Sequence, residues 1–212
     1  MEIKRAVYLI SSPTVDKCPP ANKPEYAFIG RSNVGKSSLI NMLCNNEKLA
    51  KTSRSPGKTQ MINHFDVVSE GADESGKAIQ YPWYLVDLPG YGFAKISISS
   101  RRRWEQMTEH YLKERENLSM VFVLIDSRHS PQKIDLEFLM QLQKWKVPFS
   151  LVFTKADKEN QRVVSKNVKD FLSAMKADWQ FLPQHFVTSA VKKTGRQKLL
   201  NLIHELNLSV LN

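Results

Sequence analysis

The sequence predicts an α/β protein with a mostly parallel sheet flanked by helices, and two observations support this. Runs of apolar, β-prone residues alternate with amphipathic helical patterns from residue 25 onward, as in sheets whose strands are joined by crossover helices. Between the first of these strands and the first helix, residues 30–37 are Gly-Arg-Ser-Asn-Val-Gly-Lys-Ser. This is a complete Gly-x4-Gly-Lys-Ser pattern, which forms a phosphate-binding loop between a strand and a helix.

Six strands and their connecting helices are expected along the chain. Two runs, 120–126 and 149–154, are almost continuously hydrophobic, which is typical of central strands buried on both faces. The run 61–69 mixes apolar and polar residues as an edge strand would, and the polar turn at 71–76 predicts a hairpin to the next strand. The strands are expected at residues 25–29, 61–69, 79–86, 120–126, 149–154 and 185–189. Apolar stripes at helical spacing predict helices around residues 38–43, 104–112, 136–142, 168–175 and 199–206.

The first 20 or so residues contain Pro13, Pro19 and Pro20 and are expected to form an edge strand plus a connecting loop. No repeat or second-domain linker is visible in the sequence, and 212 residues suit one domain with a substantial core. We therefore expect a single domain over residues 1–212, with residues 1–23 as an N-terminal extension.

The chain is strongly basic, because 31 Lys and Arg residues against 21 Asp and Glu residues give a formal net charge of +10. This excess favours a polyanionic partner, either nucleic acid or an acidic membrane surface, over cations that only solvate the surface. No apolar run approaches membrane-spanning length, and the N-terminal one is too short for a signal peptide. Cys18 and Cys44 form neither a metal-type pair nor a disulfide framework. We expect a cytoplasmic monomer with no transmembrane segment.

The loop at residues 30–38 is expected to bind the phosphates of a nucleotide. Its glycines let successive backbone N–H groups turn toward a polyphosphate, and the next helix presents its N-terminus to the anion. Lys36 would reach the β- and γ-phosphates, and the Ser37 hydroxyl would bind Mg²⁺. A flexible loop that matches by chance is the alternative, but it does not explain the flanking strand and helix. The predicted contacts are Gly30, Arg31, Ser32, Asn33, Val34, Gly35, Lys36, Ser37 and Ser38.

Asp-Leu-Pro-Gly at residues 87–90 follows the third predicted strand and fits the pattern Asp-x-x-Gly. An acidic residue at this place can reach Mg²⁺, and the Gly90 N–H can contact a γ-phosphate. On its own the pattern is weak, but its spacing from the phosphate loop and its position after a strand strengthen it. Nucleotide contacts are therefore predicted for Asp87, Leu88, Pro89 and Gly90.

Thr-Lys-Ala-Asp at residues 154–157 also ends a strand and predicts a base-binding loop. Asp157 would accept hydrogen bonds from guanine N1–H and N2–H, whereas adenine would leave the carboxylate unpaired. The Lys155 stem would cover one face of the base, and the Ala190 N–H, after Ser189, would face guanine O6. Taken alone, the motif is better explained as a helix-start turn capped by Asp157, so the interpretation depends on the other motifs.

In this order and at these spacings, the motifs make the chain resemble the translation-factor-like branch of small GTPases. It is most similar to the bacterial EngB/YsxC (YihA) ribosome-assembly family in the TrmE-Era-EngA-EngB-septin-like superfamily. Residues 30–41, 56–60, 87–92 and 154–158 carry the resemblance, which spans about residues 5–208. Thr154 stands where most GTPases have asparagine and matches this family's own variant. The resemblance implies a Ras-like P-loop GTPase with a mostly parallel six-stranded sheet and one antiparallel edge strand.

The resemblance also implies Mg²⁺-dependent conversion of GTP to GDP and phosphate. Thr59, in the basic loop with Gly57 and Lys58, would be the switch threonine that joins Ser37 on Mg²⁺ in the GTP state. Without the family, Thr59 only leads into the next strand. The predicted catalytic residues are Lys36, Thr59 and Gly90, and the predicted metal ligands are Ser37, Thr59 and Asp87.

Two residues bear on the rate of hydrolysis. Tyr91 stands where a Ras-like enzyme has the glutamine that orients water, so a low intrinsic rate is expected. Asn33 resembles the asparagine that ligates K⁺ in potassium-stimulated relatives, where the cation would take the electrostatic part of an arginine finger. Bracing of the phosphate loop by hydrogen bonds is an open alternative for Asn33.

Two basic clusters flank the predicted site: Arg101, Arg102 and Arg103, which open a helix, and Lys192, Lys193 and Arg196 near the base-binding end. Cations are disfavoured at a helix N-terminus, so the first cluster suggests a ligand, although either cluster could simply be solvated. With the resemblance, they predict rRNA binding by a switch in large (50S) ribosomal subunit assembly that normal cell division and septation require. The alternative is a cell-division GTPase that acts through protein or membrane partners without direct rRNA binding. A P-loop kinase is a third option, which the base-binding motif disfavours.

Overall fold

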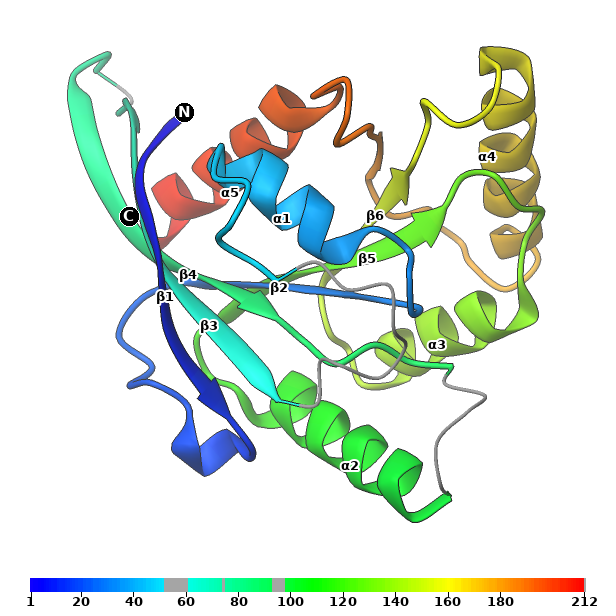
Figure 1. Cartoon of the computed structure of the whole chain (residues 1–212), viewed down its shortest axis with the longest axis horizontal. Helices are drawn as coiled ribbons and strands as arrows, with labels where there is room; N and C mark the ends of the chain where they lie inside the picture. The colour runs from blue at the N-terminus through cyan, green and yellow to red at the C-terminus, as the bar shows by residue number, and fades with distance from the viewer. Residues whose placement is uncertain (52–60, 74, 93–97, 212) are drawn as a thin grey trace.

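The computed structural model describes residues 1–51, 61–73, 75–92 and 98–211, which form one seven-stranded sheet covered by helices (Figure 1). The strands lie in the order β1-β3-β4-β2-β5-β6-β7. They are β1 (Glu2–Ser12), β2 (Glu25–Gly30), β3 (Ile62–Ala72), β4 (Ala78–Asp87), β5 (Leu118–Asp126), β6 (Phe149–Thr154) and β7 (His185–Val187). The helices are the short 3-10 helix η1 (Val15–Lys17) and α1 (Lys36–Cys44), α2 (Ile98–Glu114), α3 (Lys133–Lys144), α4 (Gln161–Met175) and α5 (Arg196–Leu211).

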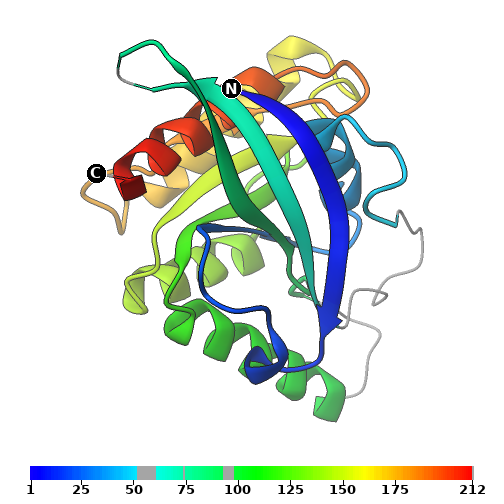
Figure 2. The same ribbon diagram turned by 90° about the vertical axis from the view of Figure 1, so that its left-hand side faces the viewer.

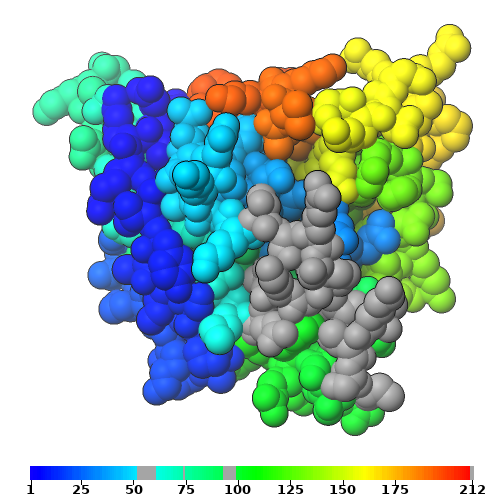
Figure 3. Space-filling model, viewed as in Figure 1, coloured from blue at the N-terminus to red at the C-terminus, as the bar shows by residue number. Residues whose placement is uncertain are grey.

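The predicted α/β class is confirmed. The described sheet has seven strands, which are the six expected between residues 25 and 189 and the N-terminal edge strand, rather than the six in total that the resemblance implies. The antiparallel strand β3 was expected at the edge, and it lies one place inside it. It pairs antiparallel with β4 on one side and with β1 on the other, in register from Glu2↔Glu70 to Ser12↔Ile62 (Figure 2). The mixed pattern of β3 comes from alternation between a buried and a half-buried face, which looks like an edge strand in sequence alone. The N-terminal edge strand itself was predicted and is β1, which forms one side of the molecule in Figure 3.

Helices cover both faces of the sheet and create two cores. On one face, Leu39 of α1 and Ile203 of α5 pack in a cluster with Phe28 of β2. On the other face, Tyr111 of α2 and Leu139 of α3 belong to a second cluster, to which α4 also contributes (Figure 1). No helix in the described part of the chain is long and apolar enough to cross a membrane.

The carboxyl ends of five parallel strands meet at one edge of the sheet, because β4, β2, β5, β6 and β7 all run in the same direction. Ligands of open α/β sheets bind outside this edge. Gly30, Asp87, Asp126 and Thr154 are the last residues of four of these strands. The motifs predicted for phosphate, metal and base therefore meet at one edge of the sheet.

The amino end of β2 holds a buried charge cluster centred on Glu25. Its carboxylate accepts hydrogen bonds from Arg115 Nη2 at 2.6 Å, from Arg115 Nε at 3.1 Å and from the Tyr111 hydroxyl at 2.5 Å. His64 Nε2 lies 3.3 Å from the carboxylate but outside hydrogen-bond geometry, so Arg115 and Tyr111 are the donors. Burial alone would raise the pKa of Glu25, and its neighbours His64, Arg115 and Tyr111 lower it to about 2.

Candidate functional site

The phosphate loop leaves β2 at Gly30 and enters α1 at Lys36. A Cβ atom at Gly30 would lie 2.8 Å from the carbonyl oxygen of Leu124, so a larger residue would push the loop away from the sheet. Asn33 and Gly35 have φ angles of 62° and 103°, left-handed conformations that curl the backbone. The loop therefore ends at the N-terminus of α1, where backbone N–H groups attract an anion.

The oxygen atoms around this loop fit a magnesium-bound phosphate. The Ser32 hydroxyl is buried and has no hydrogen-bond partner among the described residues, and such a donor costs roughly 1–3 kcal/mol unless a ligand pairs with it. Ser37 lies in the first turn of α1, and Asp87 is the last residue of β4. Their hydroxyl and carboxylate oxygens are ligands that Mg²⁺ prefers.

Lys36 and Asp87, from two separate motifs, form an ion pair in which the Lys36 ammonium donates to the Asp87 carboxylate. Both side chains are largely buried. The Leu88 N–H donates to the Phe28 carbonyl oxygen at 3.0 Å, which ties the Asp-Leu-Pro-Gly loop to β2. The sequence predicts that Lys36 binds phosphate and that Asp87 binds Mg²⁺. On nucleotide binding, Lys36 would therefore leave Asp87 for a phosphate oxygen, and Asp87 would leave Lys36 for the metal.

The predicted base-binding loop after β6 is joined to the loop after β7. The Ser189 hydroxyl donates to Asp157 Oδ1 at 2.7 Å, and the Ala156 N–H donates to the Thr188 carbonyl oxygen at 3.1 Å. The hydrogen bond from Ser189 lowers the pKa of Asp157, so its carboxylate is charged at neutral pH. Asp157 and Ser189 also border a cavity of about 810 Å³. Sequence reasoning placed both residues at the base, and the structure brings them together.

Thr154 braces the phosphate loop directly. Its hydroxyl donates to the Val34 carbonyl oxygen at 2.6 Å. It is buried at the end of β6, one residue before Lys155. The threonine that stands in place of the usual asparagine thus connects the base-binding loop to the phosphate loop.

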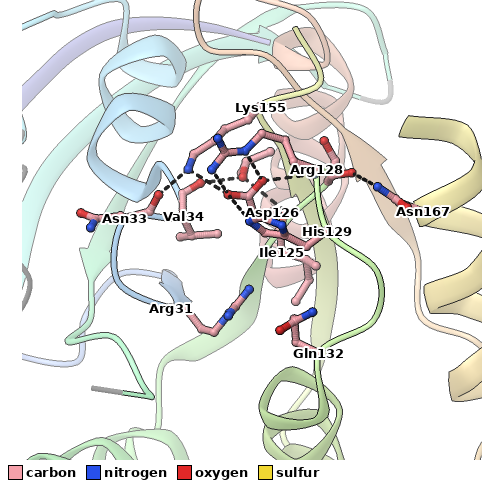
Figure 4. A network of polar contacts seen from close by, with 12 residues as sticks. Arg31, Asn33, Val34, Ile125, Asp126, Arg128, His129, Gln132, Lys155 and Asn167 are labelled. Carbon is pink, nitrogen blue, oxygen red and sulfur yellow. Dashed lines mark hydrogen bonds and ion pairs between the residues drawn. The ribbon is translucent and has the colours of Figure 1, made fainter. Parts of the chain in front are cut away.

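Lys155 makes a second connection, and its partner Asp126 was not found from the sequence. The Lys155 ammonium donates to the Asn33 carbonyl oxygen at 2.5 Å and to Asp126 Oδ2 at 2.9 Å (Figure 4). Asp126 also accepts from Arg128 Nε at 2.9 Å and from Arg128 Nη2 at 2.8 Å. Burial alone would raise the pKa of Asp126, but hydrogen bonds from Arg128 and Lys155 lower it to about 2. An acidic residue at the carboxyl end of a buried strand was the available signal, as it was for Asp87.

A second unpredicted network surrounds Tyr91, the residue after Gly90. The Tyr91 hydroxyl donates to Asp135 Oδ1 at 2.9 Å, and Arg31 Nε lies 3.2 Å from the same oxygen. The Tyr91 ring stacks on Phe138 of α3 with centroids 4.2 Å apart. Burial raises the pKa of Asp135 and, with the nearby carboxylate, raises the pKa of Tyr91 well above its usual range. Tyr91 is thereby held against α3 and linked to the phosphate loop.

Not every predicted residue can be placed. Gly57, Lys58 and Thr59 lie outside the described residues, so the predicted switch threonine has no structural account. Leu88 is fully buried in the core beneath α2, so its side chain supports the loop rather than facing a nucleotide. The remaining predicted residues that the structure describes lie in the loops at the same edge or in the first turn of α1; they are Ser37, Ser38, Pro89, Gly90 and Ala190.

The two basic clusters differ in their surroundings. Helix α2 begins at Ile98 rather than at the arginines, so only Arg101 lies in its first turn and the argument from the helix dipole applies to it alone. The side chains of Arg101, Arg102 and Arg103 are exposed. Arg196 instead donates to the carbonyl oxygens of Met42 and Leu43 at the end of α1, at 2.8 to 3.1 Å. Lys192 and Lys193 are exposed beside it.

A phosphate loop, an Asp-x-x-Gly loop and a base-binding loop at the carboxyl edge of a doubly wound sheet define the class of a Ras-like P-loop GTPase. The family profile described as "50S ribosome-binding GTPase" matches residues 25–155. The "Probable GTP-binding protein EngB" of Porphyromonas gingivalis is 52% identical over 207 residues, which cover 98% of this chain and 97% of that protein. Its counterpart in Christiangramia forsetii is 47% identical over 210 residues, 99% of this chain and 100% of that protein.

A solved structure titled as a probable GTP-binding protein EngB has the same fold, with a TM-score of 0.58 and 23% identity over 86% of this chain and 98% of that one. The chain therefore belongs to the EngB family of GTP-binding proteins and is a GTPase.

Proposed function

We propose that this GTPase binds GTP together with Mg²⁺, hydrolyses it slowly and acts as a switch in the assembly of the large ribosomal subunit. Lys36 and the phosphate-loop N–H groups would bind the phosphates, and Asp157 would bind guanine. Ser37, Thr59 and Asp87 would hold Mg²⁺, which neutralises phosphate charge during transfer. The phosphate part of this proposal is supported by the pairing of Lys36 with Asp87 and, in the same loop as Lys36, by a buried Ser32 hydroxyl that has no partner among the described residues.

The position of Tyr91 supports slow intrinsic hydrolysis. Its hydroxyl is bonded to Asp135 and its ring is stacked on Phe138, and a phenol lacks the amide that orients water in Ras-like enzymes. Asn33 could help to complete the site. The bracing hydrogen bond at this residue comes from Lys155 to its backbone carbonyl, while its side chain is exposed. Since the backbone of Asn33 makes the bracing contact, its exposed side chain is left to serve as a K⁺ ligand, which supports that role.

The position of the exposed arginines on α2 supports the ribosomal part of the proposal. Arg101, Arg102 and Arg103 lie on the helix that follows the Gly90 loop, which would sense the γ-phosphate. The net charge of +10 and the description of the matching family also favour a ribosomal polyanion. Nucleotide state at Gly90 would then change the presentation of these cations to RNA.

The test is cosedimentation of the purified protein with 50S particles in GDP, in a GTP analogue and without nucleotide. We expect tighter binding in the GTP-analogue state and a steep loss of binding as salt rises, because each phosphate contact releases counterions. A triple Arg101→Ala, Arg102→Ala, Arg103→Ala variant should keep its nucleotide affinity and lose ribosome affinity. Binding that ignores nucleotide, salt and these arginines would contradict the proposal and favour a cell-division role through protein partners.

A further inference from the structure

Asp126 is a buried carboxylate that no predicted motif contains, and it sits behind the base-binding lysine. It is the last residue of β5, beside Thr154 in the register with β6. Its side chain is 7% exposed, yet it carries a full set of charged partners. Oδ2 accepts from Lys155 and from Arg128, and Oδ1 accepts from the Arg128 side chain and backbone N–H. A buried carboxylate with this number of donors stays charged and fixed in place.

Lys155 is a side chain that needs such a partner. Ordering a lysine side chain costs up to about 2 kcal/mol of conformational entropy. If the lysine is already ordered before the base arrives, this cost does not reduce the binding affinity. Its stem passes the phosphate loop, since a Cβ atom at Gly35 would lie 3.7 Å from Lys155 Cε. Its ammonium is then shared between Asp126 and the Asn33 carbonyl oxygen.

Arg128 is the second cation at Asp126, and it keeps the carboxylate paired independently of Lys155. The Arg128 guanidinium binds Asp126 through two nitrogens (Figure 4), so the carboxylate keeps one cation even when Lys155 moves. Since Lys155 contacts only Oδ2, Asp126 can direct the lysine without depending on it for its own charge compensation.

We propose that Asp126 is the positioning residue for Lys155, and that it locks the base-binding loop and the phosphate loop into one nucleotide-ready arrangement. The inference rests on the proposed role of Lys155 at guanine. Asp126 does not touch the nucleotide in this proposal. It acts through the lysine, so its removal should raise the rate of GDP and GTP release together and leave discrimination between guanine and adenine, which depends on Asp157, unchanged.

The test is a double-mutant cycle on affinity for a fluorescent GDP analogue, with Asp126→Asn, Lys155→Ala and the double variant. A hydrogen bond to a charged group predicts about a tenfold weaker affinity for Asp126→Asn, through faster release. In the Lys155→Ala background the same change should cost less than about twofold, because the side chain that Asp126 positions is gone.

Asp66→Asn is the matched control. Asp66 is also a carboxylate between two cations, with Arg5 Nη2 at 2.6 Å and Lys23 Nζ at 2.5 Å, but Arg5 lies on β1 and Lys23 lies just before the amino end of β2. It should lower the melting temperature without changing GDP affinity. Unchanged affinity in Asp126→Asn, or an equal loss in both backgrounds, would overturn the inference. Wild-type affinity in Lys155→Ala would instead overturn the proposed base site on which it rests.

Discussion

The two ends of β2 lie beside charge clusters that differ in their surroundings, because one is enclosed in the fold and the other joins loops at the edge of the sheet. At the amino end, Glu25 is buried against Tyr111 of α2 and Arg115, the residue that follows α2, with His64 of β3 beside its carboxylate. At the carboxyl end, the pairs Lys36–Asp87 and Lys155–Asp126 join loops that are predicted to contact the nucleotide. A buried pair with no access contributes to folding or register alone, whereas a pair at an accessible loop can be exchanged for a ligand. We therefore expect stability to depend on the amino end of β2 and nucleotide binding on the carboxyl end, and four predictions test that separation.

The largest expected effect is at the carboxyl end, in the choice of base. Asp157→Asn should shift preference from guanine toward xanthine, because the amide matches the xanthine edge. Wild-type protein should reject ATP by a factor on the order of 10⁴ or more, since adenine leaves the buried carboxylate unpaired. Calorimetric titration with GTP, XTP and ATP measures this, with Lys36→Ala as the variant that should lose triphosphate binding altogether. Comparable ATP and GTP affinities in the wild type would contradict the assignment.

At the amino end, Arg115→Ala should cost stability and spare binding. It leaves Glu25 buried without its main cation, and removal of one partner of a buried pair costs about 3–5 kcal/mol. Denaturant unfolding measures the loss, and GDP affinity of the folded fraction should match wild type. Lys113→Ala is a suitable control, since its pair with Glu109 is solvent-exposed and worth less than about 1 kcal/mol. An equal loss of GDP affinity would show that the two ends of β2 are coupled.

Acid should affect the amino end in a defined pH window. The folded-state pKa of Glu25 is lowered to about 2, against about 4.3 for an unperturbed glutamate. The charged form is therefore favoured by folding, and its contribution is present above about pH 4.3 and lost as pH falls toward 2, for about 3 kcal/mol in total. Unfolding followed between pH 6 and pH 3 should show this slope, and Arg115→Ala should reduce it. An unchanged slope in that variant would separate the acid sensitivity from Glu25.

The smallest expected effect concerns the cation at the phosphate loop. If Asn33 ligates K⁺, replacing NaCl with KCl at equal ionic strength should raise GTP hydrolysis several-fold, as the cation offsets developing negative charge. Asn33→Ala should remove the difference between the salts. Equal rates in both salts, measured without ribosomes, would leave Asn33 as a bracing residue only.

Whether a site residue could be predicted from the sequence depended on how far along the chain its partner lies. The phosphate loop, Asp87 and Asp157 could be predicted because each belongs to a short motif that follows a strand. The partners Asp126, Asp135 and Arg115 were missed, because each pairs with a residue 29 to 104 positions away. The Arg115–Glu25 pair, for example, joins the segment after α2 to the start of β2. Helix periods and strand runs carry no information about such pairings, nor about which strand the N-terminal edge strand pairs with.

The backbone at Lys155 has a consequence for selection experiments. Its φ of 62° is a left-handed conformation, which glycine and asparagine adopt at lower cost than lysine. The fold would therefore accept glycine at this position with less strain, while the side chain that bridges Asn33 and Asp126 would be lost. A library at position 155 selected only for heat resistance should drift toward glycine or asparagine. The same library selected for GTP retention should return lysine, because lysine makes both of these contacts in spite of the backbone's preference.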